Sequence, residues 1–108
     1  MNNSFDWLQQ FFLSNCDGEW EHEYGCTIET MSDPGWLIRF DLRETEHAAK
    51  VLEELEDRAS PLAWLKCRME AGVFEGQCGP RRLAECIDIL RDVVEGRRGT
   101  AAPTQEQT

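Results

Sequence analysis

The cysteine whose surroundings best suit covalent chemistry is Cys78, in the run GQCGPRRL. It lies just ahead of an expected helix, and Arg81 and Arg82 fall in the first turn of that helix. A helix N-terminus and nearby guanidinium groups both stabilise a thiolate, so this pattern is typical of a reactive cysteine. A nucleophilic cysteine also needs a base, but His22 and His47 fall in no recognisable Cys/His motif. A small thiol-dependent enzyme that uses Cys78 is therefore the alternative interpretation of the sequence.

Metal binding and other catalytic chemistry have less support in the sequence. Cys16, His22 and Cys26 could supply ligands, but their C-x5-H-x3-C spacing matches none of the usual zinc patterns. The sequence contains neither a Gly-rich phosphate loop nor a Ser-His-Asp arrangement. We therefore expect no metal, no cofactor and no catalytic residue.

Acidic residues recur at odd positions between residues 19 and 29, while the even positions carry apolar or aromatic side chains and His22. Side chains alternate between the two faces of a strand, so a strand here would gather the carboxylates on one face. Such a face repels itself unless it stays hydrated or binds a cationic partner. Trp20, between two acids, could add an exposed aromatic contact for Arg or Lys. The predicted partner-binding residues are Asp17, Glu19, Trp20, Glu21, Glu23, Glu29 and Asp33.

The net charge of −10 is confined to the first half of the chain. Residues 1–57 hold fourteen acids and three bases, a charge of −11, while residues 58–108 hold seven acids and eight bases, a charge of +1. A field of this sign repels nucleic acid and anionic membranes and attracts cationic proteins. We therefore expect a basic protein as the partner, and neither nucleic acid nor membrane.

Apolar spacing predicts a helix over residues 4–14, with Ser4 as its N-cap. Residues 21–31 and 36–42 then read as two strands joined by the turn Ser32-Asp33-Pro34-Gly35. Residues 64–70 and 73–78 read as a second hairpin that turns at Ala71-Gly72. A last helix opens with Pro80 at its first position and closes at Gly96.

Residues 45–59 are open to two interpretations. Their Ala, Leu and Glu content and the spacing of Ala48, Leu52, Leu55 and Ala59 favour a helix, but a strand or an irregular edge is also consistent with the sequence. The fold class is α+β: an antiparallel sheet of about four strands, formed by two hairpins and covered by N- and C-terminal helices. Residues 1–96 form one domain, and residues 97–108 are predicted to be a disordered tail.

The five cysteines are odd in number and match no disulfide scaffold, so we expect reduced thiols, most of them buried. No stretch of the sequence approaches the ~18 apolar residues of a membrane span. The N-terminal residues do not resemble a signal peptide. These observations predict a cytoplasmic protein, while its oligomeric state stays open, including an oligomerising structural domain as a third interpretation.

Several motifs resemble the immunity protein 53 family of bacterial polymorphic toxin systems. They are the WLQQFF helix, the run CDGEWEHEYG, the DPGW turn before an apolar strand, and W-x2-C-R-x-E-x-G-x-F-E-G ahead of GP-x2-L. The resemblance covers about residues 5–95, and D-G-E-W-E-H-x-Y-G is its most specific part. It implies a non-enzymatic bacterial protein that binds and neutralises a cognate toxin. Since many toxins are nucleases with basic active sites, an acidic surface on this chain would suit such a partner.

Overall fold

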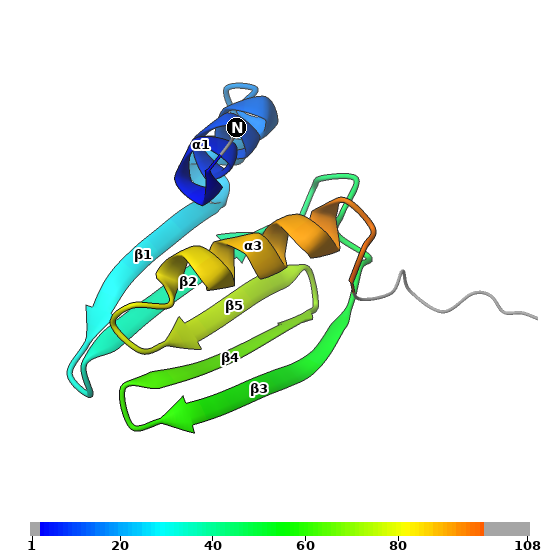
Figure 1. The fold of residues 1–108 in the computed structure, drawn as a ribbon. Coiled ribbons are helices and arrows are strands. Elements are labelled where there is room, and N and C mark those ends of the chain that lie inside the picture. Colours follow the sequence, from blue (N-terminus) through cyan, green and yellow to red (C-terminus); the bar gives the residue numbers. More distant parts are fainter. Residues whose placement is uncertain (1–2, 99–108) are drawn as a thin grey trace, which may run out of the picture.

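A computed structural model describes residues 3–98, which form an α+β fold around one antiparallel sheet. The sheet has five strands in the order β1-β2-β5-β4-β3, one more than the sequence predicted. Figure 1 shows the helices gathered on one side of the sheet, with α3 running across its middle. The elements are α1 (Ser4–Asn15), α2 (Trp20–Glu23), β1 (Gly25–Met31), β2 (Gly35–Asp41), β3 (Leu52–Ser60), β4 (Ala63–Glu70), β5 (Val73–Cys78) and α3 (Leu83–Val94).

Both predicted hairpins are confirmed. Strands β1 and β2 pair from Gly25↔Asp41 to Met31↔Gly35, with the turn at residues 32–34. Strands β4 and β5 meet at a two-residue turn in which Ala71 and Gly72 have φ angles of 55° and 83°. Positive φ at both positions is the geometry that two-residue hairpins favour, because its twist matches that of the strands.

The fifth strand comes from the segment whose structure the sequence left open. Residues 52–60 form β3, so the strand interpretation is correct there and the helix interpretation is wrong. Leu52 lies opposite Met69 and Leu55 opposite Cys67, so the two leucines extend the apolar surface under the helices. Residues 43–49 form consecutive turns that lead into this strand.

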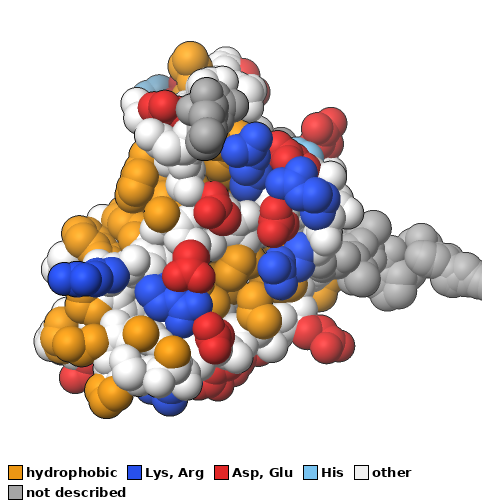
Figure 2. All heavy atoms as spheres, viewed as in Figure 1, with side chains coloured by type: hydrophobic (Ala, Val, Ile, Leu, Met, Phe, Trp, Pro, Cys, Tyr) orange, Lys and Arg blue, Asp and Glu red, His pale blue; other side chains and the backbone are white. Residues whose placement is uncertain are grey.

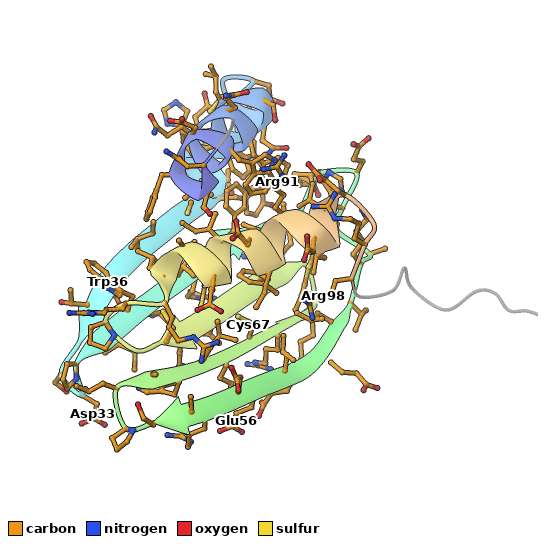
Figure 3. All side chains as sticks on the ribbon, in the orientation of Figure 1. Asp33, Trp36, Glu56, Cys67, Arg91 and Arg98 are labelled. Atoms are coloured by element: carbon orange, nitrogen blue, oxygen red, sulfur yellow. The ribbon has the colours of Figure 1, made fainter. Side chains whose placement is uncertain are left out.

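The core lies between the sheet and helices α1 and α3. Every second residue of the inner strands points into it, as the alternation predicted. The fully buried large side chains are Ile38, Phe40, Leu42, Met69, Phe74, Ile87, Leu90 and Val93. Cys67 lies beneath α3 (Figure 3), with its Sγ 3.7 Å from that of Cys86. A Cβ at Gly76 would lie 3.2–3.3 Å from both sulfur atoms, so the absence of a side chain there leaves room for the thiols.

The predicted start of the first helix at residue 4 is confirmed, but its cap and the start of the last helix differ from the prediction. Asn3, not Ser4, caps α1, because its side chain accepts a hydrogen bond from the Asp6 N–H at 2.7 Å. The last helix begins at Leu83 instead of Pro80, since Arg82 N–H still bonds to the Gly79 carbonyl in a separate turn at 3.1 Å. Gly96, with φ of 82°, follows the end of α3 as expected.

No helix within residues 3–98 is long and apolar enough to span a membrane. The predicted tail falls outside the described residues from residue 99 onward. Its first two residues, Arg97 and Arg98, are described, and both form ion pairs with Asp92.

Candidate partner-binding site

The acidic segment after α1 folds as a turn and a short helix, not as a strand. Residues Trp20–Glu23 form α2, and the first strand begins only at Gly25. The predicted row of carboxylates on one strand face is therefore wrong for Glu19, Glu21 and Glu23. The physical reason is local: the Asp17 carboxylate accepts hydrogen bonds from Glu19 N–H and Trp20 N–H, both at 2.9 Å, which starts a helical turn.

Two of the acids stabilise this turn. While the Asp17 carboxylate accepts the N–H groups just before and at the start of α2, the Glu21 carboxylate accepts from Asp17 N–H at 3.0 Å and Gly18 N–H at 2.9 Å. The N–H groups of Trp20 and Glu19 lower the pKa of Asp17, and backbone N–H groups, its own included, lower the pKa of Glu21. Both carboxylates are therefore ionised at neutral pH. Hydrogen bonds at both ends give the turn a defined shape.

Trp20 is not exposed, which corrects its predicted role as a surface aromatic. Its side chain is only 4% exposed. The ring lies 5.7 Å from that of Phe40 in the core and 5.7 Å from that of Phe12 on α1. Its position in sequence between two acids concealed this, because the neighbouring carboxylates point away from the core while the indole points into it. Trp20 therefore attaches the acidic turn to the sheet.

Two adjoining hollows open around this turn. The first, of about 560 Å³, is lined by Asp17, Gly18, Glu19, Trp20, His22, Glu23, Tyr24 and Glu44. The second, of about 680 Å³, shares Asp17, Trp20 and Glu44 with the first and extends to Glu46 and His47. No pattern in the sequence had singled out Glu44 and Glu46 as site residues. Their signal was the acidic excess of the first half of the chain, but only the fold shows that the turns after β2 approach α2.

The five acids Asp17, Glu19, Glu21, Glu23 and Glu44 form what we call the acidic cluster. None of them has an ion-pair partner among residues 3–98. The cation beside the cluster, Arg43, stacks over Tyr24 at 5.2 Å, but its guanidinium group is 2.6 Å from the Asp41 carboxylate. The negative charge of the cluster is therefore left largely uncompensated.

In other regions of the surface, several acids lie beside arginine side chains. On the open face of the sheet, Glu75 lies 3.8 Å from Arg39 and 3.6 Å from Arg68. Around α3, Arg82 bridges Asp57 and Glu85 at 2.7 Å each. Figure 2 shows the same mixture, with blue and red side chains adjacent to one another over the helix-covered side. The acidic cluster differs from these regions in lacking such partners.

Two of the predicted binding residues lie apart from the cluster. Glu29 is on β1, opposite Leu37, and is exposed. Asp33 is in the β1–β2 turn, at the far end of the hairpin from α1 (Figure 3), where it lines a separate hollow with Pro34. The structure therefore brings Asp17, Glu19, Trp20, Glu21 and Glu23 together and leaves these two outside.

The structure argues against a thiol enzyme based on Cys78. This residue is completely buried, and it precedes a turn instead of the first turn of α3. A hydrogen bond with Cys86 and burial raise the pKa of the Cys78 thiol well above its usual range. Burial likewise raises the pKa of the half-buried Cys26 to about 11. Neither thiol has the thiolate character that nucleophilic catalysis needs.

We therefore predict slow labelling of the native protein by a thiol reagent at neutral pH. Cys67, Cys78 and Cys86 should react only after unfolding, because all three are inaccessible to solvent. Cys26, which is half-buried, should react faster as the pH rises toward its pKa of about 11. Mass spectrometry of peptides after timed labelling would measure each rate. Rapid reaction of native Cys78 at neutral pH would contradict the burial described here.

The described residues contain no group of three His, Cys, Asp or Glu side chains placed to hold a metal ion. Cys16, His22 and Cys26 in particular are not grouped in this way. The first hollow itself is lined by acidic side chains together with Trp20 and Tyr24, and a surface of this charge attracts cationic groups.

Comparison with known protein families identifies a match over most of the chain. The family model described as Immunity protein 53 matches residues 5–95, which include all eight elements of the fold except the first residue of α1. No curated protein and no solved structure matches the chain.

Proposed function

The chain belongs to the immunity protein 53 family, and on this premise we propose that it neutralises a toxin by binding it through the acidic cluster. Proteins of such families generally act by binding and not by catalysis. The buried, weakly acidic thiol of Cys78 supports the same conclusion for this chain.

The observation that carries the proposal is the contrast in charge compensation. Glu75 on the open sheet face, and Asp57 and Glu85 near α3, have arginine partners, while the five acids of the cluster have none among residues 3–98. Glu29 and Asp33 also lack ion pairs within that range, but they do not line the hollows around the acidic turn. Uncompensated like charges repel one another, so they destabilise the free protein slightly. A cationic group of a partner would relieve this repulsion and form favourable electrostatic interactions on binding. If the cluster already formed ion pairs within the free protein, a partner's cation would add little binding energy.

The cluster also has the shape of a binding surface. Its charges surround two hollows instead of standing on a flat face, and Trp20 and Tyr24 line the first hollow. An arginine or lysine side chain that enters this hollow would meet carboxylates at the rim and aromatic groups beneath. Beside it, Phe12 and Leu13 of α1 are 36% and 70% exposed, which adds apolar area for contact.

The rigidity of the turn favours tight binding. The hydrogen bonds of Asp17 and Glu21 hold the backbone in place before any partner arrives. A surface that is already ordered loses less conformational entropy on association. Opposite charges on the two proteins would also accelerate their encounter, in a manner that salt weakens.

The chemistry of the cluster indicates a basic toxin. A nuclease fits best, because its substrate-binding surface must attract phosphates and would therefore attract these carboxylates. The proposed inhibition is then direct: the immunity protein occupies the surface on which the nucleic acid would lie.

Charge reversal of the cluster is the test. We expect Glu19→Lys combined with Glu23→Lys to weaken binding of the cognate toxin by about tenfold to a hundredfold, or about 1.4–2.8 kcal/mol. The two side chains are chosen because neither hydrogen-bonds the turn, whereas a change at Glu21 would also disturb its backbone. Calorimetry at several salt concentrations measures affinity, and survival of cells that express the toxin measures neutralisation.

The matched control is Glu53→Lys with Glu54→Lys, which makes the same change in net charge at exposed positions of β3. This control should bind and protect nearly as well as the unaltered protein. If both double variants protect equally well, the acidic cluster is not the binding surface. If the unaltered protein binds no toxin, the proposed function itself fails.

A further inference from the structure

The sheet has two edges, and they differ in how they resist pairing with another strand. Strand β3 forms one edge. It carries several exposed acidic side chains, and its register is irregular between Leu52 and Leu55 and again between Arg58 and Ser60. Charges and bulges are the features by which edge strands avoid edge-to-edge association. Strand β1 forms the other edge, as Figure 1 shows, with regular register throughout and a single charged residue, Glu29.

The hydrogen-bonding groups that β1 leaves open can be assigned from the ladder. Leu42 N–H donates to the Gly72 carbonyl at 2.7 Å, so even-numbered residues of β2 direct their backbone groups toward β5. Odd-numbered residues of β2 then face β1, because neighbouring residues alternate. The β1–β2 register is continuous and pairs odd-numbered residues of β2 with odd-numbered residues of β1, so the odd-numbered residues of β1 bond to β2. It leaves the N–H and C=O groups of Cys26, Ile28 and Thr30 directed outward from the sheet.

These outward groups repeat every second residue around Ile28, which makes the edge self-complementary. In an antiparallel pair centred on Ile28, each Ile28 bonds with its counterpart, and Cys26 bonds with Thr30 of the second copy. Thr27 then lies opposite Glu29, so no like charges stand directly opposite each other. The Ile28 side chain, 38% exposed in a single chain, would contact its equivalent on the helix-covered side of the sheet.

We propose that β1 pairs antiparallel with β1 of a second copy of this chain, which joins the two sheets into one continuous sheet. This inference goes beyond the proposed function and does not depend on it. The acidic cluster adjoins the Gly25 end of β1, so antiparallel pairing places the two clusters at opposite ends of the shared edge. Both clusters therefore stay open to their own partners.

Electrostatics and area set the strength of this dimer. Each chain carries a charge of −10, so long-range repulsion opposes association and added salt should strengthen it. A seven-residue strand pair buries less than the roughly 1,200 Å² at which stable specific interfaces begin. We therefore expect reversible association that increases with protein concentration.

Sedimentation equilibrium over about a hundredfold range of protein concentration, at low and high salt, is the experiment. A monomer–dimer equilibrium that shifts toward dimer with salt is the expected result. Amide hydrogen exchange should slow at Cys26, Ile28 and Thr30 as dimer forms, while the amides of Thr27 and Glu29, already within the β1–β2 ladder, change little. A protein that stays monomeric at every concentration and salt level overturns the proposal, even if a toxin strand later protects the same amides.

Two variants locate the interface. Ile28→Lys places two ammonium groups across the symmetry axis, and Ile28→Pro removes an outward N–H without removing a bond to β2. Both should abolish the dimer while circular dichroism stays unchanged, and the lysine variant keeps the test valid if proline unfolds the hairpin. Leu62→Ser, which alters an apolar residue 59% exposed in the β3–β4 turn, is the control and should dimerise normally. Dimers that survive the Ile28→Lys change would show that β1 is not the contact.

Discussion

Replacing Gly79 by alanine is expected to reduce the free energy of unfolding by at least about 3 kcal/mol, a large part of the roughly 5–15 kcal/mol that domains possess. Gly79 follows β5 and donates its N–H to the Trp64 carbonyl at 2.8 Å. A Cβ at this position would lie 2.1 Å from the Leu62 carbonyl oxygen and 2.8 Å from its carbon. Both are backbone atoms, so the clash cannot be relieved by rotating a side chain. The β3–β4 turn would have to move away from β5.

Thermal unfolding measures this effect, and a fall in melting temperature of at least about 12 °C is expected for a chain of this size. Gly96→Ala is the matched control, because Gly96 has a φ of 82° but no atom within 4 Å of the added Cβ. It should cost only about 1–2 kcal/mol, the penalty for a side chain in left-handed backbone. Similar losses in the two variants would mean that contact with Leu62 is not the cause.

Phe40→Ala should destabilise the protein by about 3–5 kcal/mol, the usual loss when a buried phenylalanine is truncated. Phe40 is completely buried, and its ring lies 5.0 Å from that of Phe11 and 5.7 Å from that of Trp20. The substitution therefore removes the core support of the residue that attaches the acidic turn. Denaturation in urea measures the stability, and hydrogen exchange at the Trp20 amide should accelerate at the same time.

Phe12→Ala provides the comparison, since Phe12 contacts the same indole from the solvent side and is 36% exposed. Its loss should be clearly smaller, because less apolar surface returns to water. An equal cost at both positions would contradict the placement of Trp20 between core and surface.

The hairpins could be predicted from the sequence because their signals are local. Ile38 and Phe40 alternate with exposed Arg39, and turn-forming residues stand at each reversal, so strand and register follow from a few neighbouring positions. The segment Leu52–Ser60 lacked such a signal. Its composition favours a helix, and it becomes a strand because Leu52 and Leu55 find places opposite Met69 and Cys67. Contacts of that kind depend on the tertiary structure.

The proposed binding site could be predicted in composition but not in geometry. The acidic excess of the first half of the chain identified Asp17, Glu19, Glu21 and Glu23, which the fold does bring together. Alternation of acids suggested a strand, but the hydrogen bonds to the Asp17 carboxylate and the burial of Trp20 produce a helical turn instead. Glu44 was missed because it joins the cluster through the turns after β2, which no local pattern in the sequence specifies.

The carboxylates of the acidic turn have two different roles. Asp17 and Glu21 hold the backbone, while Glu19 and Glu23 contribute charge without supporting the fold. Substitutions at the second pair are therefore nearly free of folding cost, whereas substitutions at the first pair are not. A lineage of such chains could exchange Glu19 and Glu23 for other side chains as its toxins diverge, and retain the same scaffold. Under the proposed function, the choice of partner in this fold could therefore evolve independently of stability.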